Sequence, residues 1–265
     1  MIAPNLSQTK LSRSVPGLKA LVLAAGEGSR LRPLTLSRPK PMLPIGGRPL
    51  LEHTLRWLRS YGVEEVVINL HYRGDVVTSY FGDGSGVGVR LQYSPEEKIL
   101  GTAGAVRKLL PYFDGPALVV YGDLLTNIDL ERLWAFHARN TPAITLSLYE
   151  PQNPQDCGIV ELDKTGAVVR IEEKPAADRL FSALAFSGVM LLHRSVIEMI
   201  PADTVYDFGY HLLPRAIGSG LPVYGLPIGK SEYVIDIGTP ERYSRACREW
   251  ALRNPSARAE GGSLC

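Results

Sequence analysis

The chain has 265 residues, 45% apolar and 21% charged, values that are typical of a globular protein and exclude disorder over most of its length. Its 29 basic and 27 acidic side chains give a net charge of +2, too balanced for a dedicated nucleic-acid or membrane-surface binder. No apolar run approaches the roughly 18 residues of a membrane helix. We therefore expect neither nucleic acid nor membrane among its partners.

The N-terminal segment and the cysteines indicate a cytoplasmic protein. Residues 1–17 lack the apolar core of a signal peptide, so we expect a flexible leader there. Cys157, Cys247 and Cys265 have no metal-binding or redox spacing, which favours a reduced compartment. A flexible tail is expected over 254–265.

Strand and helix patterns alternate through the first half of the chain. Short runs rich in β-branched residues predict strands over 19–24, 65–70, 89–93 and 117–121. Apolar faces at helical spacing predict helices near Leu51–Leu58 and over 75–81, 103–110 and 130–140. This alternation favours an α/β fold with a Rossmann-like, doubly wound, mainly parallel sheet covered on both faces.

The second half is richer in strands. Strand-like runs occupy 143–149, 158–162, 168–173 and 187–193. The turn at 163–166, Asp-Lys-Thr-Gly, predicts a hairpin between the second and third of these runs. Short helices are expected over 195–200 and 210–217, followed by a last helix whose apolar face carries Tyr243, Ala246, Cys247 and Trp250. Cys247 is expected to fill space on that face. Because no long linker interrupts the pattern, we predict one mixed domain over 18–253, its second half forming a small β-rich subregion.

The most informative segment is Leu23–Pro49, LAAGEGSRLRPLTLSRPKPMLPIGGRP, which follows the first predicted strand. Gly26 and Gly28 would let the backbone approach phosphates closely. Arg30 and Lys40 add two cations on a loop stiffened by prolines. Neither the dinucleotide-binding GxGxxG nor the phosphate-binding GxxxxGK[ST] motif occurs. The segment favours an anion-binding loop at a strand end over a structural turn with solvated cations.

This segment resembles the signature of the sugar-nucleotide pyrophosphorylases, which join sugar 1-phosphates to nucleoside triphosphates. The family pattern LAGGxGTRLxPLTxxxPKPmLPi stands here as LAAGEGSRLRPLTLSRPKPMLPI. Four further motifs follow in the family's order: LGTAGA (100–105), YGD (121–123), EEKP (172–175) and DIGTPERY (236–243). The resemblance spans about residues 18 to 250 and is nearest to the mannose-1-phosphate guanylyltransferase branch.

The resemblance implies one nucleotidyltransferase domain with a nucleotide-binding half (18–140) and a sugar-phosphate-binding half (141–253). Because the chain ends soon afterwards, we expect none of the hexapeptide-repeat domain that some relatives add. The implied nucleotide-binding residues are Leu23, Ala24, Ala25, Gly26, Glu27, Gly28, Ser29, Arg30, Lys40, Glu96, Gly101, Thr102 and Asp123. The implied sugar-phosphate-binding residues are Gly158, Glu173, Lys174, Ser187 and Gly188.

The resemblance also implies roles in catalysis. Arg30 and Lys40 would neutralise the leaving β- and γ-phosphates, and Lys174 would hold the phosphate of the incoming sugar. Asp123 and Asp236 would hold Mg²⁺, the expected cofactor. Taken alone, each aspartate could instead cap a following segment.

The identities of the base and of the sugar are predicted from single positions outside the shared motifs. Glu96 precedes LGTAGA where relatives often carry a base-reading Gln, and a carboxylate suits the two adjacent donors of guanine. This favours GTP, with mannose 1-phosphate as the sugar substrate. Phe186 and Ser187 replace the Asn-Ala of many relatives, and Val234 replaces their Trp, so the sugar pocket is expected to differ.

Three functional hypotheses follow. The first is an enzyme that makes GDP-mannose or a similar GDP-hexose. The second is a uridylyl- or thymidylyltransferase acting on glucose 1-phosphate or another sugar 1-phosphate, such as an N-acetylated one. The third is an inactive nucleotide-sugar-binding regulator, which would be free to lose the five charged site residues that this chain keeps: Arg30, Lys40, Asp123, Lys174 and Asp236. A homodimer is compatible with the chain's size, although no segment demands one.

Overall fold

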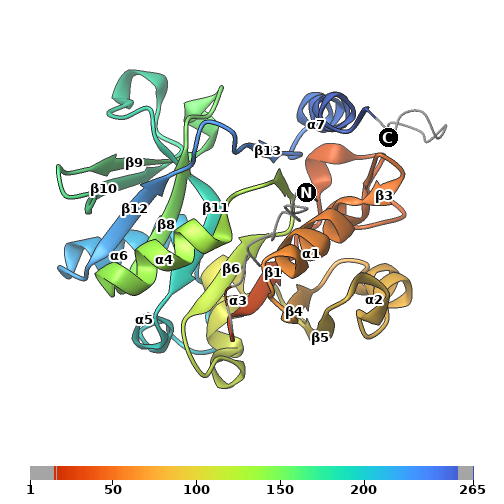
Figure 1. The fold of residues 1–265 in the computed structure, drawn as a ribbon, viewed down its shortest axis with the longest axis horizontal. Coiled ribbons are helices and arrows are strands. Elements are labelled where there is room, and N and C mark those ends of the chain that lie inside the picture. The colour runs from red at the N-terminus through yellow and green to blue at the C-terminus, as the bar shows by residue number, and fades with distance from the viewer. Residues whose placement is uncertain (1–14, 16, 256–264) are drawn as a thin grey trace, which may run out of the picture.

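The computed structural model describes residues 15, 17–255 and 265, and its centre is a nine-stranded mixed sheet (Figure 1). The main path of the sheet runs β10-β9-β11-β6-β1-β4-β5, while β8 pairs with β11 and β12 pairs with β8. The strands are β1 (Lys19–Leu23), β4 (Glu65–Leu70), β5 (Arg90–Pro95), β6 (Ala117–Tyr121), β8 (Ile144–Tyr149), β9 (Gly158–Leu162), β10 (Val168–Glu173), β11 (Ala185–Leu192) and β12 (Val223–Pro227). The predicted mixed, mainly parallel α/β sheet is confirmed.

The first half forms the parallel core, in which β1 lies between β4 and β6 and β5 extends the sheet beyond β4. The register pairs Leu23, the last residue of β1, with Asn69 of β4 and with Tyr121 of β6. Because parallel strands end at the same edge, this register gathers the segments that follow β1, β4 and β6.

Helices cover both faces of the sheet because successive strand residues point to opposite sides. On β1, Ala20 and Val22 pack into one apolar core and Leu21 into the other. The first core includes α1 (Leu50–Ser60), α2 (Gly74–Phe81) and α4 (Leu130–Asn140), and the second includes α3 (Gly101–Lys108), α5 (Arg194–Glu198) and α6 (Leu213–Gly218). This doubly wound arrangement leaves one edge of the sheet open to the loops.

The last helix, α7 (Pro240–Arg253), closes a third apolar cluster beside the sheet (Figure 1). Thr239 caps it by accepting a hydrogen bond from the Arg242 backbone amide. Short strand pairs join this cluster to the sheet: β2 (Pro44–Ile45) with β3 (Arg48–Pro49), and β7 (Leu124–Thr126) with β13 (Val234–Asp236). Strands this short leave no alternating pattern, which explains why the sequence did not predict them.

The predicted hairpin is confirmed, since β9 and β10 pair antiparallel across the turn that begins at Asp163. The helix expected over 210–217 differs: a π-helical turn at Phe208–Leu212 (η7) precedes α6. A Cβ atom built on Gly209 would lie 2.3 Å from Glu173 Oε2. The turn therefore brings a bare backbone against a carboxylate of β10, a tertiary contact that helical periodicity cannot show.

Cys247 is buried in the third cluster as predicted, and it is paired with Cys265 in a disulfide. This corrects the expectation that the cysteines are unpaired thiols. The sequence spacing of the cysteines does not reveal this pairing.

The described part of the chain contains no helix with the length and apolar character needed to span a membrane. Val15 is buried, and its amide donates to the Tyr61 carbonyl. The predicted flexibility of the leader and of the tail concerns residues that lie mostly outside the described ones.

Candidate functional site

The carboxyl edge of the parallel strands lines a cavity of about 300 Å³. Nine residues that the sequence predicted for nucleotide binding line it: Leu23, Ala24, Ala25, Gly26, Lys40, Glu96, Gly101, Thr102 and Asp123. The remaining lining residues are Pro41, Asn69, Ile99, Tyr121 and Asp207. Residues from four loops therefore meet in one pocket, where doubly wound folds place ligands.

The loop after β1 brings a lysine back over its own glycines. Gly28 has a φ of +63°, and a Cβ built there would lie 3.0 Å from Lys40 Cβ and 3.1 Å from Thr35 Cγ2. Thr35 is fully buried and donates to the Gly28 carbonyl. Glycine at 28 therefore permits the close return of the loop that places Lys40 in the cavity.

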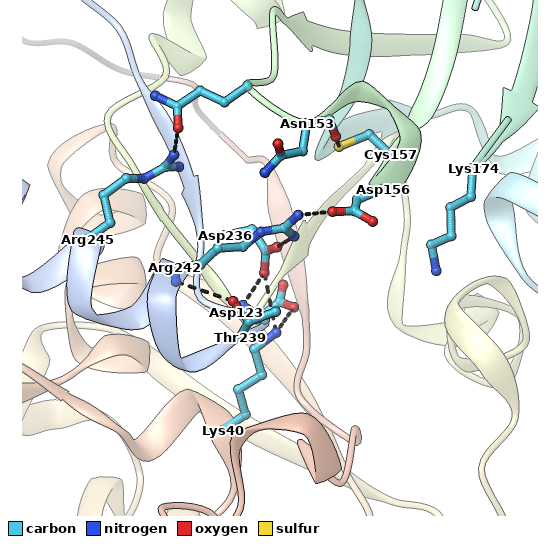
Figure 2. Close-up of polar contacts among 12 residues, drawn as sticks. Lys40, Asp123, Asn153, Asp156, Cys157, Lys174, Asp236, Thr239, Arg242 and Arg245 are labelled. Atoms are coloured by element: carbon cyan, nitrogen blue, oxygen red, sulfur yellow. Dashed lines mark hydrogen bonds and ion pairs between the residues drawn. The ribbon is translucent and has the colours of Figure 1, made fainter. Parts of the chain in front are cut away.

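Lys40 lies between the two predicted metal-binding carboxylates (Figure 2). Its Nζ is 2.5 Å from Asp123 Oδ2 and 3.4 Å from Asp236 Oδ1. Burial alone would raise the pKa of Asp236, but the charge of Lys40 and the hydrogen bond from Arg242 outweigh it, so this pKa lies below its usual value. Asp123 comes shortly after β6, and Asp236 is the last residue of β13. The fold brings both carboxylates to the Lys40 ammonium group.

A buried polar chain links the first loop to Glu96. The Ala24 amide donates to Asn69 Oδ1 over 2.8 Å, and Asn69 Nδ2 donates to Glu96 Oε1 over 2.9 Å. The other oxygen of Glu96 accepts from the Leu100 amide at 3.0 Å. Each carboxylate oxygen has two acceptor positions, so the side chain keeps capacity toward the cavity that it lines.

The glycines of LGTAGA allow a distant segment to lie directly on α3. The Tyr206 carbonyl accepts from the amides of Ala103 and Gly104, and a Cβ on Gly101 would lie 2.7 Å from the same oxygen. Next to it, Asp207 Oδ1 accepts from both the amide and the hydroxyl of Thr102 at 3.2 Å. The N-terminus of α3 is thereby fixed at the wall of the cavity.

The predicted sugar side lies beside this cavity. The Glu173 carboxylate fits between two glycines, because a Cβ on Gly158 would lie 2.7 Å and one on Gly209 2.3 Å from Oε2. Burial raises the pKa of Glu173, and Lys174 partly offsets this effect. Lys174 has a φ of +50°, its Nζ lies 4.0 Å from Glu173 Oε1, and its side chain lies apart from the contacts of Arg242 and Lys40 in Figure 2.

The other predicted residues lie less centrally. Glu27, Ser29 and Arg30 are exposed, although an Arg30 Nη2 atom lies 3.4 Å from the Cβ position of Gly238, next to Asp236. Ser187 is buried, and its hydroxyl accepts from the Val189 amide. Gly188 has a φ of +89° and packs against Tyr121 and Leu124. Of these two, only Gly188 contacts a residue that lines the cavity, Tyr121.

Four polar residues of the site escaped the sequence analysis: Asn69, Asp156, Asp207 and Arg242. Asn69 had a usable signal, since it is a polar residue near the end of a buried parallel strand. Asp207 and Asp156 lie in irregular segments without a pattern. Arg242 is part of DIGTPERY, but its position in the sequence is typical of a solvated helix residue. Only the structure shows that its Nη1 lies 2.6 Å from Asp236 Oδ2.

Comparisons with known proteins give the family to which the chain is similar. A family model described as nucleotidyl transferase matches residues 19–251. A UTP–glucose-1-phosphate uridylyltransferase of Synechocystis is 35% identical over 245 residues, covering 87% of this chain and 63% of that protein. A mannose-1-phosphate guanylyltransferase of Mycobacterium tuberculosis is 36% identical over 231 residues, covering 85% of this chain and 62% of that protein. The chain thus spans slightly less than two thirds of both relatives.

Among solved structures, HddC from Yersinia pseudotuberculosis complexed with GMP-PN superposes with a TM-score of 0.74 at 26% identity, covering 88% of this chain and 99% of that one. The family match takes in every strand of the central sheet and both aspartates that contact Lys40. The chain therefore belongs to the nucleotidyl transferase family.

Proposed function

We propose that the protein transfers a nucleoside monophosphate from a nucleoside triphosphate to a sugar 1-phosphate and releases pyrophosphate. The observation that carries the proposal is the convergence of Lys40, Asp123 and Asp236 at a cavity lined by a glycine loop. A buried cation between two carboxylates, beside a phosphate-sized cavity, suits a reaction between two phosphates.

The chemistry needs charge neutralisation more than proton transfer. An oxygen of the sugar 1-phosphate attacks the α-phosphorus, and the bond from that phosphorus to the pyrophosphate oxygen breaks. The attacking phosphate has a second pKa of about 6, so it is ionised at neutral pH without a general base. Lys40 and Arg30 would stabilise the leaving phosphates, and Lys174 would align the attacking one.

The donor set fits a magnesium ion. Asp123 and Asp236 each present a carboxylate oxygen toward the same point, now contacted by the Lys40 ammonium group. Among the described residues, no cluster of three or more His, Cys, Asp or Glu side chains could hold a metal. Mg²⁺ is commonly bound by one or two carboxylates together with water and substrate phosphates, which agrees with this pair. When bound, the ion would supply charge neutralisation at the phosphates.

For the substrates, we propose GTP and mannose 1-phosphate. Glu96 lines the cavity as an acceptor, and guanine offers two adjacent donors where uracil and thymine offer one. The guanylyltransferase relative and the GMP-PN complex of HddC support this choice. UTP with glucose 1-phosphate is the second candidate, because a relative of comparable identity is named a uridylyltransferase.

The test is a pyrophosphate-release assay with Mg²⁺ that crosses the common nucleoside triphosphates with a panel of sugar 1-phosphates. We expect the highest kcat/KM for GTP with mannose 1-phosphate, and we expect Asp123→Ala to lower kcat by at least about a hundredfold with every pair. A different best pair would change the proposed substrates and keep the reaction. Tight binding of a nucleotide sugar without pyrophosphate release from any pair would instead favour the inactive regulator.

A further inference from the structure

Arg242 joins the Asp236 carboxylate to the loop that precedes the sugar side of the site (Figure 2). Its Nη1 donates to Asp236 Oδ2 at 2.6 Å, and its Nη2 pairs with Asp156 Oδ2. Asp156 ends the 3₁₀ turn η5 (Pro154–Asp156), directly before β9. One guanidinium group on the first turn of α7 therefore holds two carboxylates from different parts of the chain.

The same loop, residues 150–157, is held at two further points. One turn along α7, Arg245 donates to Gln152 Oε1, so two arginines on one face of the helix contact the loop. At the end of the loop, the Cys157 carbonyl accepts from the Lys174 backbone amide at 3.0 Å. A continuous series of contacts thus runs from Asp236 through Arg242 and the loop to Lys174.

We propose that Arg242 is a positioning residue, which orients Asp236 and at the same time fixes the 150–157 loop beside Lys174. The inference rests on the proposed function, because it concerns the same site. Arginine suits this role since its planar group directs N–H donors to two acceptors at once, whereas lysine offers a single point charge. Arg242 contacts no phosphate in this assignment and acts only through its two partners.

The two ion pairs of Arg242, with Asp236 and with Asp156, are expected to contribute different free energies. The Asp236 side chain is 27% exposed, and the Asp156 side chain is 52% exposed. An exposed ion pair contributes little because water screens it, while a mostly buried carboxylate that loses a partner is destabilised more strongly. Loss of Arg242 should therefore act mainly on catalysis through Asp236, and loss of Asp156 mainly on the loop.

The kinetic test compares Arg242→Gln, Asp156→Asn and the matched control Arg245→Gln, which removes a neighbouring contact to the loop but none to Asp236. We expect Arg242→Gln to lower kcat by about tenfold to a hundredfold, the range for losing a charged hydrogen bond. Asp156→Asn should raise the KM for the sugar phosphate about threefold to fivefold with kcat unchanged, and Arg245→Gln should stay within about twofold for kcat. The KM for the nucleotide should not change in Asp156→Asn.

The conservative variant Arg242→Lys separates the effect of the Asp236 contact from the effect of the Asp156 contact. It should recover kcat to within about tenfold of wild type, because a cation again faces Asp236, yet keep the raised KM of Asp156→Asn. Unchanged kcat and KM values in Arg242→Gln, or an equal loss of kcat in Arg245→Gln, would overturn the assignment. If Arg242→Gln fails to fold, as judged by circular dichroism, the kinetics of Arg242→Lys decide.

A second readout does not depend on turnover. Cys157 is a free, half-buried thiol whose Sγ lies 3.7 Å from the Asn153 carbonyl within the loop. Because Arg242 lowers and Asp156 raises the pKa of this thiol, its alkylation rate is compared at an alkaline pH where the thiol is ionised in every variant. Measured by peptide mass spectrometry, that rate should rise at least about threefold in Arg242→Gln and in Asp156→Asn if the loop is released. Equal rates in wild type and both variants would overturn the tethering role. Failure of the proposed function would appear separately, as no pyrophosphate from wild type with any pair.

Discussion

Glu96 makes structural hydrogen bonds at the cavity in which we propose that it also reads the base. Its two oxygens accept from Asn69 and from the Leu100 amide, and the side chain is 6% exposed while it lines the cavity. These bonds fix the orientation of the carboxylate, which is the condition for reading a base by hydrogen bonds. A mobile surface glutamate would discriminate much less.

We therefore expect Glu96→Gln to reduce the preference for GTP over UTP by about tenfold or more, since the amide replaces one acceptor with a donor. The measurement is the ratio of kcat/KM for the two nucleotides at saturating sugar phosphate. Glu97→Gln, one residue further along the chain, is the matched control and should leave the ratio unchanged. A constant ratio in Glu96→Gln would exclude the carboxylate from base recognition.

Glu173 carries a cost in stability. Burial raises the pKa of its carboxyl group between Gly158 and Gly209, so the native state binds the proton more tightly than the unfolded state. Its contribution to the free energy of unfolding is therefore most favourable below the unfolded pKa and is lost as the pH rises through the higher native pKa. At neutral pH the charged form is held in place at the expense of stability.

Glu173→Gln should consequently raise the thermal midpoint at pH 7 relative to wild type, and the difference should shrink as the pH falls through the raised native pKa and be absent below the unfolded pKa of about 4.3. The same variant should raise the KM for the sugar phosphate if this carboxylate binds sugar hydroxyls. Glu172→Gln, its more exposed strand neighbour, provides the comparison. A midpoint that falls at pH 7 would show that the charge is stabilising instead.

At the scale of single elements, α3 depends on the absence of side chains along one face. A Cβ on Gly104 would lie 2.7 Å from the Thr204 carbonyl oxygen and 3.1 Å from Leu100 Cβ. Backbone hydrogen bonds fix the segment that contains Thr204 against α3: the Leu100 carbonyl accepts from the Tyr206 amide, and the Tyr206 carbonyl accepts from the Gly104 amide. Alanine at this position must push apart a segment that also carries Asp207.

Gly104→Ala should therefore destabilise the protein by about 1–3 kcal/mol despite the better helix propensity of alanine, and should lower the thermal midpoint by several degrees. Gly218→Ala, at the end of α6, is the matched control because no atom lies within 4 Å of its Cβ position. It should be neutral or stabilising. Equal thermal midpoints for the two variants would show that the 204–208 segment can move away from a Cβ at position 104 with little loss of stability.

The elements differ in how well the sequence predicted them. β9 and β10 were predicted to the residue, because alternating strands around an Asp-Lys-Thr-Gly turn leave a local pattern. The three-residue strands β7 and β13 left none, and the π-helical turn at Phe208 follows from a contact with Glu173 that lies far away in sequence. The loop after β1 could be predicted to line a ligand cavity, since its residues are contiguous in the sequence. Asp156 and Arg242 could not, because only the fold brings them together.

At the scale of the whole molecule, one sheet runs through both the predicted nucleotide half (18–140) and the predicted sugar half (141–253). β11 pairs with β6 of the nucleotide half and with β8 and β9 of the sugar half, so the two halves share backbone hydrogen bonds across the sheet. The two large apolar cores each contain residues of both halves. Neither half can therefore unfold without exposing part of the other's core.

We accordingly expect a single cooperative transition in urea, with coincident curves for tryptophan fluorescence and far-ultraviolet circular dichroism. GTP with Mg²⁺ at about 100 times its dissociation constant should stabilise the native state by about 2.7 kcal/mol. With a urea dependence of about 1–3 kcal/mol per molar, this moves the midpoint by about 1–3 M. The ligand should shift both curves together although it binds the nucleotide half. Two separated transitions, of which only one responds to the nucleotide, would show that residues 18–140 and 141–253 unfold as independent units and that the shared strand β11 does not couple them.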